Sequence, residues 1–122
     1  MADEITLTGG ISWSKSYLKG SVPTTTTQIT MSGTHRCASV QDIGTSHELI
    51  VVPAELATLG VAYVKNVDAT NYIEIGRDVA ASFYGVIKLK PGEGFPIRFS
   101  NVALYARANI ATAKLQYEIL ED

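Results

Sequence analysis

The sequence predicts an all-β fold, an antiparallel β-sandwich formed by a chain of 122 residues. Three observations predict it. Apolar and polar residues alternate with a period of two along most of the chain, as they do in strands with one buried face. Roughly nine or ten such segments are separated by short turn signals, the spacing typical of sandwiches and barrels. No long helical pattern recurs between them, so a parallel α/β sheet is not expected.

The first strands are expected soon after the N-terminus. Residues 1–10, which end in Thr8-Gly9-Gly10, are predicted to form an N-terminal arm, and residues 11–122 the sandwich. Ile11, Trp13 and Tyr17 share one parity, which predicts a strand with a buried face. The β-branched run 24–27 leads into a further strand, in which Ile29 and Met31 are expected to point inward.

The middle of the chain combines strands with one helical turn. Residues 36–41 predict a strand, and the continuous apolar run in residues 48–52 predicts another, covered on both faces. Pro53 at a first helical position, the early acid Glu55 and the closing Gly60 predict a short helical turn near residues 53–59.

The second half of the chain carries the strongest strand signals. The turn 68–71 is rich in residues that bond to their own backbone, and Lys90-Pro91-Gly92-Glu93 fits a type II turn. Pro96 favours an edge strand or a bulge. Strands are therefore expected at residues 61–67, 71–76, 82–90, 95–99 and 102–108, and in a closing segment where Leu115, Tyr117 and Ile119 face one way.

Composition excludes several classes of function. The net charge of −2 provides neither a basic face for nucleic acid nor a polybasic segment for an anionic membrane. Cys37 is the single cysteine, so an internal disulfide is impossible and folding does not depend on oxidation. The acidic N-terminus lacks a charged region followed by an apolar run, so no secretory signal is expected.

Candidate catalytic and metal-binding residues are few. His35 and Cys37 could supply two metal ligands, but zinc normally needs three or four, so a turn histidine and a core thiol are expected instead. His47 precedes a strand. Asp68, Glu74 and Asp78, with an oxygen of Asn71, fall far short of a calcium-binding loop. No helix follows the glycines after Lys90, so no phosphate loop is expected. The sequence predicts no enzyme, no metal and no cofactor.

Aromatic residues leave two alternatives open. They could form a sugar-binding platform, or they could pack on the sheets with their hydroxyl groups at the rim. Tyrosines that stay exposed could instead make subunit contacts. The residues concerned are Trp13, Tyr17, Tyr63, Tyr72, Tyr84, Tyr105 and Tyr117.

The second half of the chain also carries an ordered set of turn phrases. Residues 60–76 read GVAYVKNVDATNYIEIG, with Asn66, Asp68 and Asn71 in an Asn-x-Asp-x-x-Asn turn. A Leu-x-Pro-Gly-Glu hairpin follows at residues 89–93, then Leu-Tyr-Ala at 104–106 and a closing strand. In order and spacing this resembles small structural proteins of tailed bacteriophages, most closely capsid decoration (cement) proteins. The resemblance covers about half of the chain.

That resemblance implies a jelly-roll β-sandwich without catalytic residues. It implies a homotrimer on the outer surface of the capsid, bound to the major capsid protein of the virion and synthesised in the host cytoplasm. Neither nucleic acid nor membrane is an expected partner. The capsid- or subunit-binding residues are expected in the arm and in two loops: Ile5, Leu7, Trp13, Asp68, Asn71, Pro91 and Phe95.

Two other functions compete with this expectation. A carbohydrate- or receptor-binding module of a tail or head fibre would need exposed aromatic residues, such as Trp13 and Tyr84, along a groove. A small cupin-like enzyme would need clustered histidines, and the chain has two.

Overall fold

The computed structural model describes residues 4–122, which form ten strands and no helix. Contacts divide the chain into two units, residues 1–32 and residues 33–122. The first unit is a hairpin of β1 (Ile5–Lys15) and β2 (Leu18–Ile29). Because β1 continues through Gly10, the boundary lies at Ser32 and not after residue 10 as the sequence suggested. Residues 1–3 of the expected arm lie outside the described residues.

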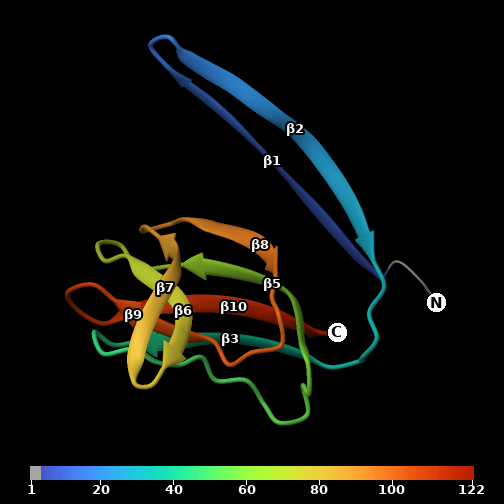
Figure 1. Cartoon of the computed structure of the whole chain (residues 1–122), viewed down its shortest axis with the longest axis vertical. Helices are drawn as coiled ribbons and strands as arrows, with labels where there is room; N and C mark the ends of the chain where they lie inside the picture. Colours follow the sequence, from blue (N-terminus) through green and yellow to red (C-terminus); the bar gives the residue numbers. More distant parts are fainter. Residues whose placement is uncertain (1–3) are drawn as a thin grey trace. The chain divides into compact units, whose positions relative to one another are not determined.

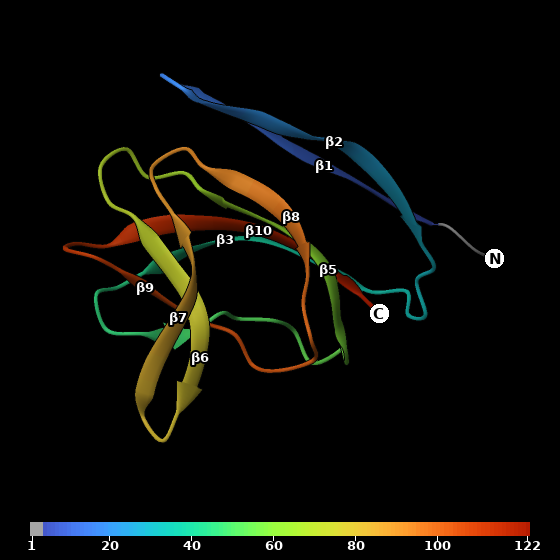
Figure 2. The same cartoon turned by 45° about the horizontal axis from the view of Figure 1, so that its top comes forward.

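The second unit is a sandwich of two four-stranded antiparallel sheets (Figures 1 and 2). One sheet has the order β3-β10-β5-β8 and the other β4-β9-β6-β7. The strands are β3 (Arg36–Ile43), β4 (Glu48–Leu49), β5 (Leu59–Asn66), β6 (Ile73–Val79), β7 (Ser82–Leu89), β8 (Gly94–Arg98), β9 (Tyr105–Ala108) and β10 (Ala113–Glu121).

Strand pairing identifies the sandwich as a jelly roll. β3 pairs with β10, β4 with β9, β5 with β8 and β6 with β7. The first four strands of the sandwich therefore pair, in reverse order, with the last four. The pairs β10–β5 and β9–β6 then complete the two sheets. This is the eight-stranded, double Greek-key arrangement. The expected antiparallel, jelly-roll-like sandwich is confirmed.

The core lies between the two sheets and follows the period-two pattern. Along β10, Leu115, Tyr117 and Ile119 are buried, whereas Lys114 and Gln116 are exposed. Ile73 and Ile75 of β6 supply the facing side. Alternation of this kind lets each strand bury one face at about 25 cal/mol per Å² of apolar surface and leave the other hydrated.

Turns and edges in this unit follow the sequence closely. Glu93 N donates to Lys90 O at 3.0 Å and Gly92 has φ 82°, as a type II turn requires. Pro96 lies in β8, at an edge of its sheet, where its missing N–H leaves no ladder bond unmade.

Two expectations for the middle of the chain are wrong. Residues 53–59 form one turn and no helix: Leu56 N donates to Pro53 O at 3.1 Å, but Ala57 N donates to the Glu121 carboxylate, which stops helical continuation. In the run 48–52 only β4 is a strand. Ile50 is buried but Leu49 and Val51 are exposed, so one face is covered and not both. The described residues include no helix long and apolar enough to cross a membrane.

Candidate functional site

The β1–β2 hairpin is the most unusual surface of the molecule. Its strands pair antiparallel from Ile5↔Ile29 to Lys15↔Leu18, joined by the two-residue turn Ser16-Tyr17. Ser16 has φ 55°, a positive value typical of tight hairpin turns, whose twist matches that of the flanking strands. The register shifts once, where Pro23 and Thr24 oppose Gly10; this bulge accommodates the proline inside a strand.

One face of the hairpin is apolar and the other is polar. Cross-strand partners lie on the same face of an antiparallel pair. One face therefore carries mainly Ile5, Leu7, Ile11, Trp13, Leu18, Val22 and Ile29, and the opposite face carries Thr6, Thr8, Ser12, Ser14, Lys19, Ser21, Thr26 and Gln28. We call the first set the apolar face of the hairpin. The Trp13 indole lies over Gly20, its cross-strand partner, where a side chain would have no room.

Much of this apolar face is in contact with water. Ile11 is 62% exposed, Leu18 67% and Val22 53%, whereas Ile5, Leu7 and Ile29 are partly buried. The strand over residues 11–15 is therefore confirmed, but its predicted buried face is wrong. A two-stranded hairpin is only marginally stable alone, and none of the other described strands pairs with its outer edges. These features are typical of a segment that a macromolecular partner covers.

A second group of predicted residues meets at one end of the sandwich. The buried side chain of Asn66 connects the turn after β5 to the turn after β7. Its Nδ2 donates to Asn71 O at 2.8 Å and to Leu89 O at 3.0 Å, and its Oδ1 accepts from Asp68 N at 2.9 Å. Its backbone exchanges hydrogen bonds with the turn that contains Pro91, since Gly92 N donates to Asn66 O.

The Asp68 carboxylate holds the turn after β5 in shape, at the same end of the sandwich as Asn66. Oδ2 accepts from Asn71 N at 2.7 Å and from Thr70 N at 3.0 Å, and these bonds lower the pKa of Asp68. The Asn-x-Asp-x-x-Asn phrase is thus explained by the turn itself. The exposed apolar residues Val67 and Ile110, from the turns after β5 and β9, lie on this end as well.

The structure therefore divides the seven predicted binding residues into three places. Ile5, Leu7 and Trp13 lie on the apolar face of the hairpin. Asp68, Asn71 and Pro91 lie together at one end of the sandwich, whereas Phe95 packs against the core from β8. Asn66 belongs to the predicted Asn-x-Asp-x-x-Asn turn, but its role in joining two turns was not predicted. An asparagine closing a buried strand directly before an Asp turn is the signal that could have identified it.

Glu121 organises the opposite end of the sandwich. Its carboxylate accepts from Thr34 N at 3.0 Å, His35 N at 3.1 Å, His35 Nδ1 at 2.9 Å and Ala57 N at 2.9 Å. The bonds from Ala57 and His35 are the largest cause of a pKa lowered to about 2. This carboxylate ties the residues that follow the hairpin to the loop 50–58.

The predicted metal ligands do not gather. His35 bonds to Glu121, while Cys37 packs against the core and burial raises the pKa of its thiol. Within residues 4–122 no group of three or more His, Cys, Asp or Glu side chains could hold a metal ion.

The remaining candidate acid and histidine groups lie on the outer face of the β4-β9-β6-β7 sheet. Glu74 pairs with Arg107 at 2.8 Å, and His47 Nε2 lies 3.6 Å from Asp78 Oδ2. His47 also stacks on Phe83, with ring centroids 5.5 Å apart. Among the described residues, Asp78 Oδ1 is buried without a hydrogen-bond partner.

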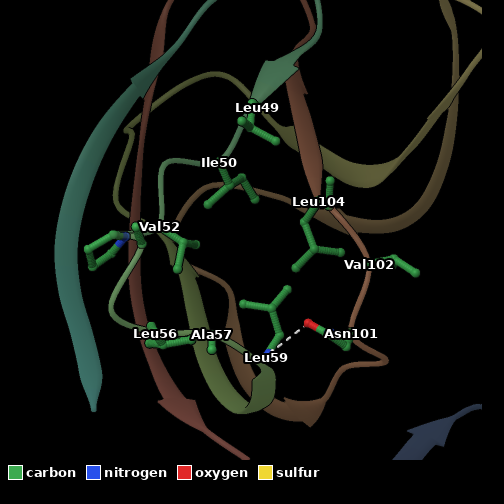
Figure 3. A pocket seen from close by; sticks show the side chains of 12 residues that line it. Leu49, Ile50, Val52, Leu56, Ala57, Leu59, Asn101, Val102 and Leu104 are labelled. Carbon is green, nitrogen blue, oxygen red and sulfur yellow. Dashed lines mark hydrogen bonds between the residues drawn. The ribbon is translucent and has the colours of Figure 1, made fainter.

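An apolar pocket of about 370 Å³ opens beside Glu121 (Figure 3). The loop 50–58 forms one wall and the segment 101–104 the other, and Leu59 N donates to Asn101 Oδ1 at 3.1 Å across it. Its lining is almost entirely aliphatic: Leu49, Ile50, Val52, Pro53, Ala54, Leu56, Ala57, Leu59, Asn101, Val102, Ala103 and Leu104. The sequence pattern of residues 50–58 does not predict this pocket.

The aromatic residues lie on several different elements, and two of them, Tyr63 and Tyr117, border a pocket of about 280 Å³ over β3, β10 and β5. Trp13 and Tyr17 belong to the hairpin, whereas Tyr63 and Tyr84 are exposed on β5 and β7. Tyr117 is buried and donates to Val51 O at 2.7 Å. Carbohydrate binding thus stays a prediction without a described platform. Comparison with protein-family models found no matching family, and comparison with curated proteins found no matching relative.

Proposed function

We propose that this chain is a structural protein of a tailed-phage virion, a decoration (cement) protein that binds the outside of the capsid and stabilises the shell. It acts through surface contacts, without catalysis, as a homo-oligomer that we expect to be a trimer. The hairpin is the arm with which each subunit grips a neighbouring subunit of the particle. The sequence resemblance supports the phage assignment, and the jelly-roll sandwich is an architecture that viral capsid proteins use.

The exposed apolar face of the hairpin is the observation that carries the proposal. An apolar ribbon in water is an aggregation hazard, and stable proteins rarely keep one unless a partner covers it. Seven apolar side chains are spread along strands of 11 and 12 residues, so they form one continuous contact surface. Many such contacts around a shell add through effective concentration, and binding to the assembled shell alone stabilises it by mass action.

Particle composition tests the proposal. Virions of the phage that encodes the chain are purified on a density gradient, and its peptides are quantified against the major capsid protein. We expect a fixed stoichiometry for the wild type. The double variant Ile11→Ser/Trp13→Ser should be depleted from particles at least about tenfold, whereas the polar-face control Ser12→Ala/Ser14→Ala should stay bound. Absence of the wild-type chain from purified virions would contradict the proposal.

A further inference from the structure

The tip of the hairpin presents an unusual pair of side chains. Tyr17 is fully exposed and Leu18 is 67% exposed, and they stand between Lys15 and Lys19. Residues 5–29 contain these two lysines and no acidic residue. The tip is thus an apolar knob with a cationic rim.

The apolar pocket beside Glu121 has the complementary character. Its volume of about 370 Å³ suits one phenol ring together with one small aliphatic group. The segment 49–59 carries one carboxylate, that of Glu55, and no lysine or arginine, and residues 101–104 carry no charge. Glu55 is exposed and lies between the lining residues Ala54 and Leu56. The hairpin tip has apolar side chains flanked by two lysines, and the pocket has an aliphatic lining with a carboxylate beside it. The two surfaces are complementary in polarity and in charge.

We propose that the tip of the hairpin of one copy, Tyr17 and Leu18, inserts into the apolar pocket of a second copy. Lys15 and Lys19 then lie near Glu55 of that copy. The inference rests on the proposed function in one respect: it names the neighbouring subunit that the hairpin arm grips. The contact is head-to-tail, so repeating it around a threefold axis closes a ring of three chains.

The occupant proposed is a second copy of this chain, because the tip and the pocket are complementary in polarity and in charge. Cross-linking between differently tagged chains distinguishes this contact from one within a single chain.

Intermolecular disulfide trapping tests this contact in the full-length chain. Two differently tagged versions are made in a Cys37→Ser background, one with Tyr17→Cys and the other with Ala54→Cys, and they are mixed and oxidised. We expect a heterodimeric cross-link. The matched control replaces Tyr17→Cys with Ser12→Cys on the polar face, and it should give at most about a tenth of that product. Equal cross-linking of the two, or none, would overturn the inference.

A charge exchange gives an independent measurement of the same contact. Self-association of the pure protein is measured by sedimentation equilibrium. Lys15→Glu/Lys19→Glu should weaken it about thirtyfold or more, and adding Glu55→Lys should restore part of the loss. A wild type that stays monomeric at all concentrations overturns the inference but leaves virion association open. A self-associating chain absent from virions instead contradicts the proposed function alone.

Discussion

Single residues fix the two ends of the sandwich by hydrogen bonds and not by apolar packing. Asn66 and Glu121 are the buried polar and charged residues in the described part of the second unit. The Asn66 amide donates to two backbone carbonyl oxygens, and the Glu121 carboxylate accepts from backbone N–H groups that would otherwise lack a partner. Such residues decide how loops are held, and loops carry the binding surfaces of a rigid sandwich.

Glu121 makes the stability of the sandwich depend on pH. Its pKa is lowered to about 2 from an ordinary value of 4.5, so the folded state favours the carboxylate. This contribution is complete above about pH 4.5 and is lost as the pH falls toward 2. Glu121→Gln should lower the melting temperature at pH 7, and thermal melts should show the difference from wild type shrinking between pH 4.5 and 2. The control Glu55→Gln, at an exposed site, should change little; a pH-independent difference would contradict this account.

At the scale of elements, the turn between β6 and β7 is a site of backbone strain. Ala80 has φ 53° and Ala81 has φ 67°, both in the left-handed region. That region costs a non-glycine residue about 1–2 kcal/mol, and a two-residue turn with two positive φ values prefers Asn-Gly. Because alanine is not a typical turn-forming residue, the tight turn at Ala80-Ala81 is not predictable from the sequence.

Relieving that strain should stabilise the protein. Ala80→Asn/Ala81→Gly is expected to raise the free energy of unfolding by about 1 kcal/mol, measured by urea denaturation at constant m-value. Ala81→Val should lower it, since a β-branched side chain suits this conformation poorly. A double variant no more stable than wild type would argue against a strained turn.

The strands also show which parts of the fold can be predicted from the sequence. The strands expected at residues 61–67, 71–76, 82–90 and 95–99 match β5 to β8 to within three residues at either end, because apolar–polar alternation predicts them, whereas β9 begins at Tyr105 and not at residue 102. The hairpin shows the same alternation without burial. A period-two pattern predicts which face of a strand is apolar, but it does not predict what covers that face. Residues 11–32 are therefore expected in the sandwich from their pattern, although they form a separate hairpin unit.

In the whole molecule, the predicted binding residues lie in separate places, on the hairpin and at one end of the sandwich. Asp68, Asn71 and Pro91 converge because the turn phrases that contain them are tied together by Asn66. The pocket beside Glu121 could not be predicted, since its two walls are about 40 residues apart in sequence and meet through the jelly-roll topology. The charges of the hairpin tip were visible in the sequence, but their significance depends on that pocket.

We propose that the hairpin is an assembly arm, covered in the particle and exposed in the free subunit. Hydrogen–deuterium exchange of the β1 and β2 amides measures this directly, on dilute monomeric chain and on purified virions. The account predicts rapid exchange over residues 5–29 in the free chain and strong protection in the particle, while the β10 amides are protected in both. Hairpin amides that exchange at the same rate in both states would contradict it.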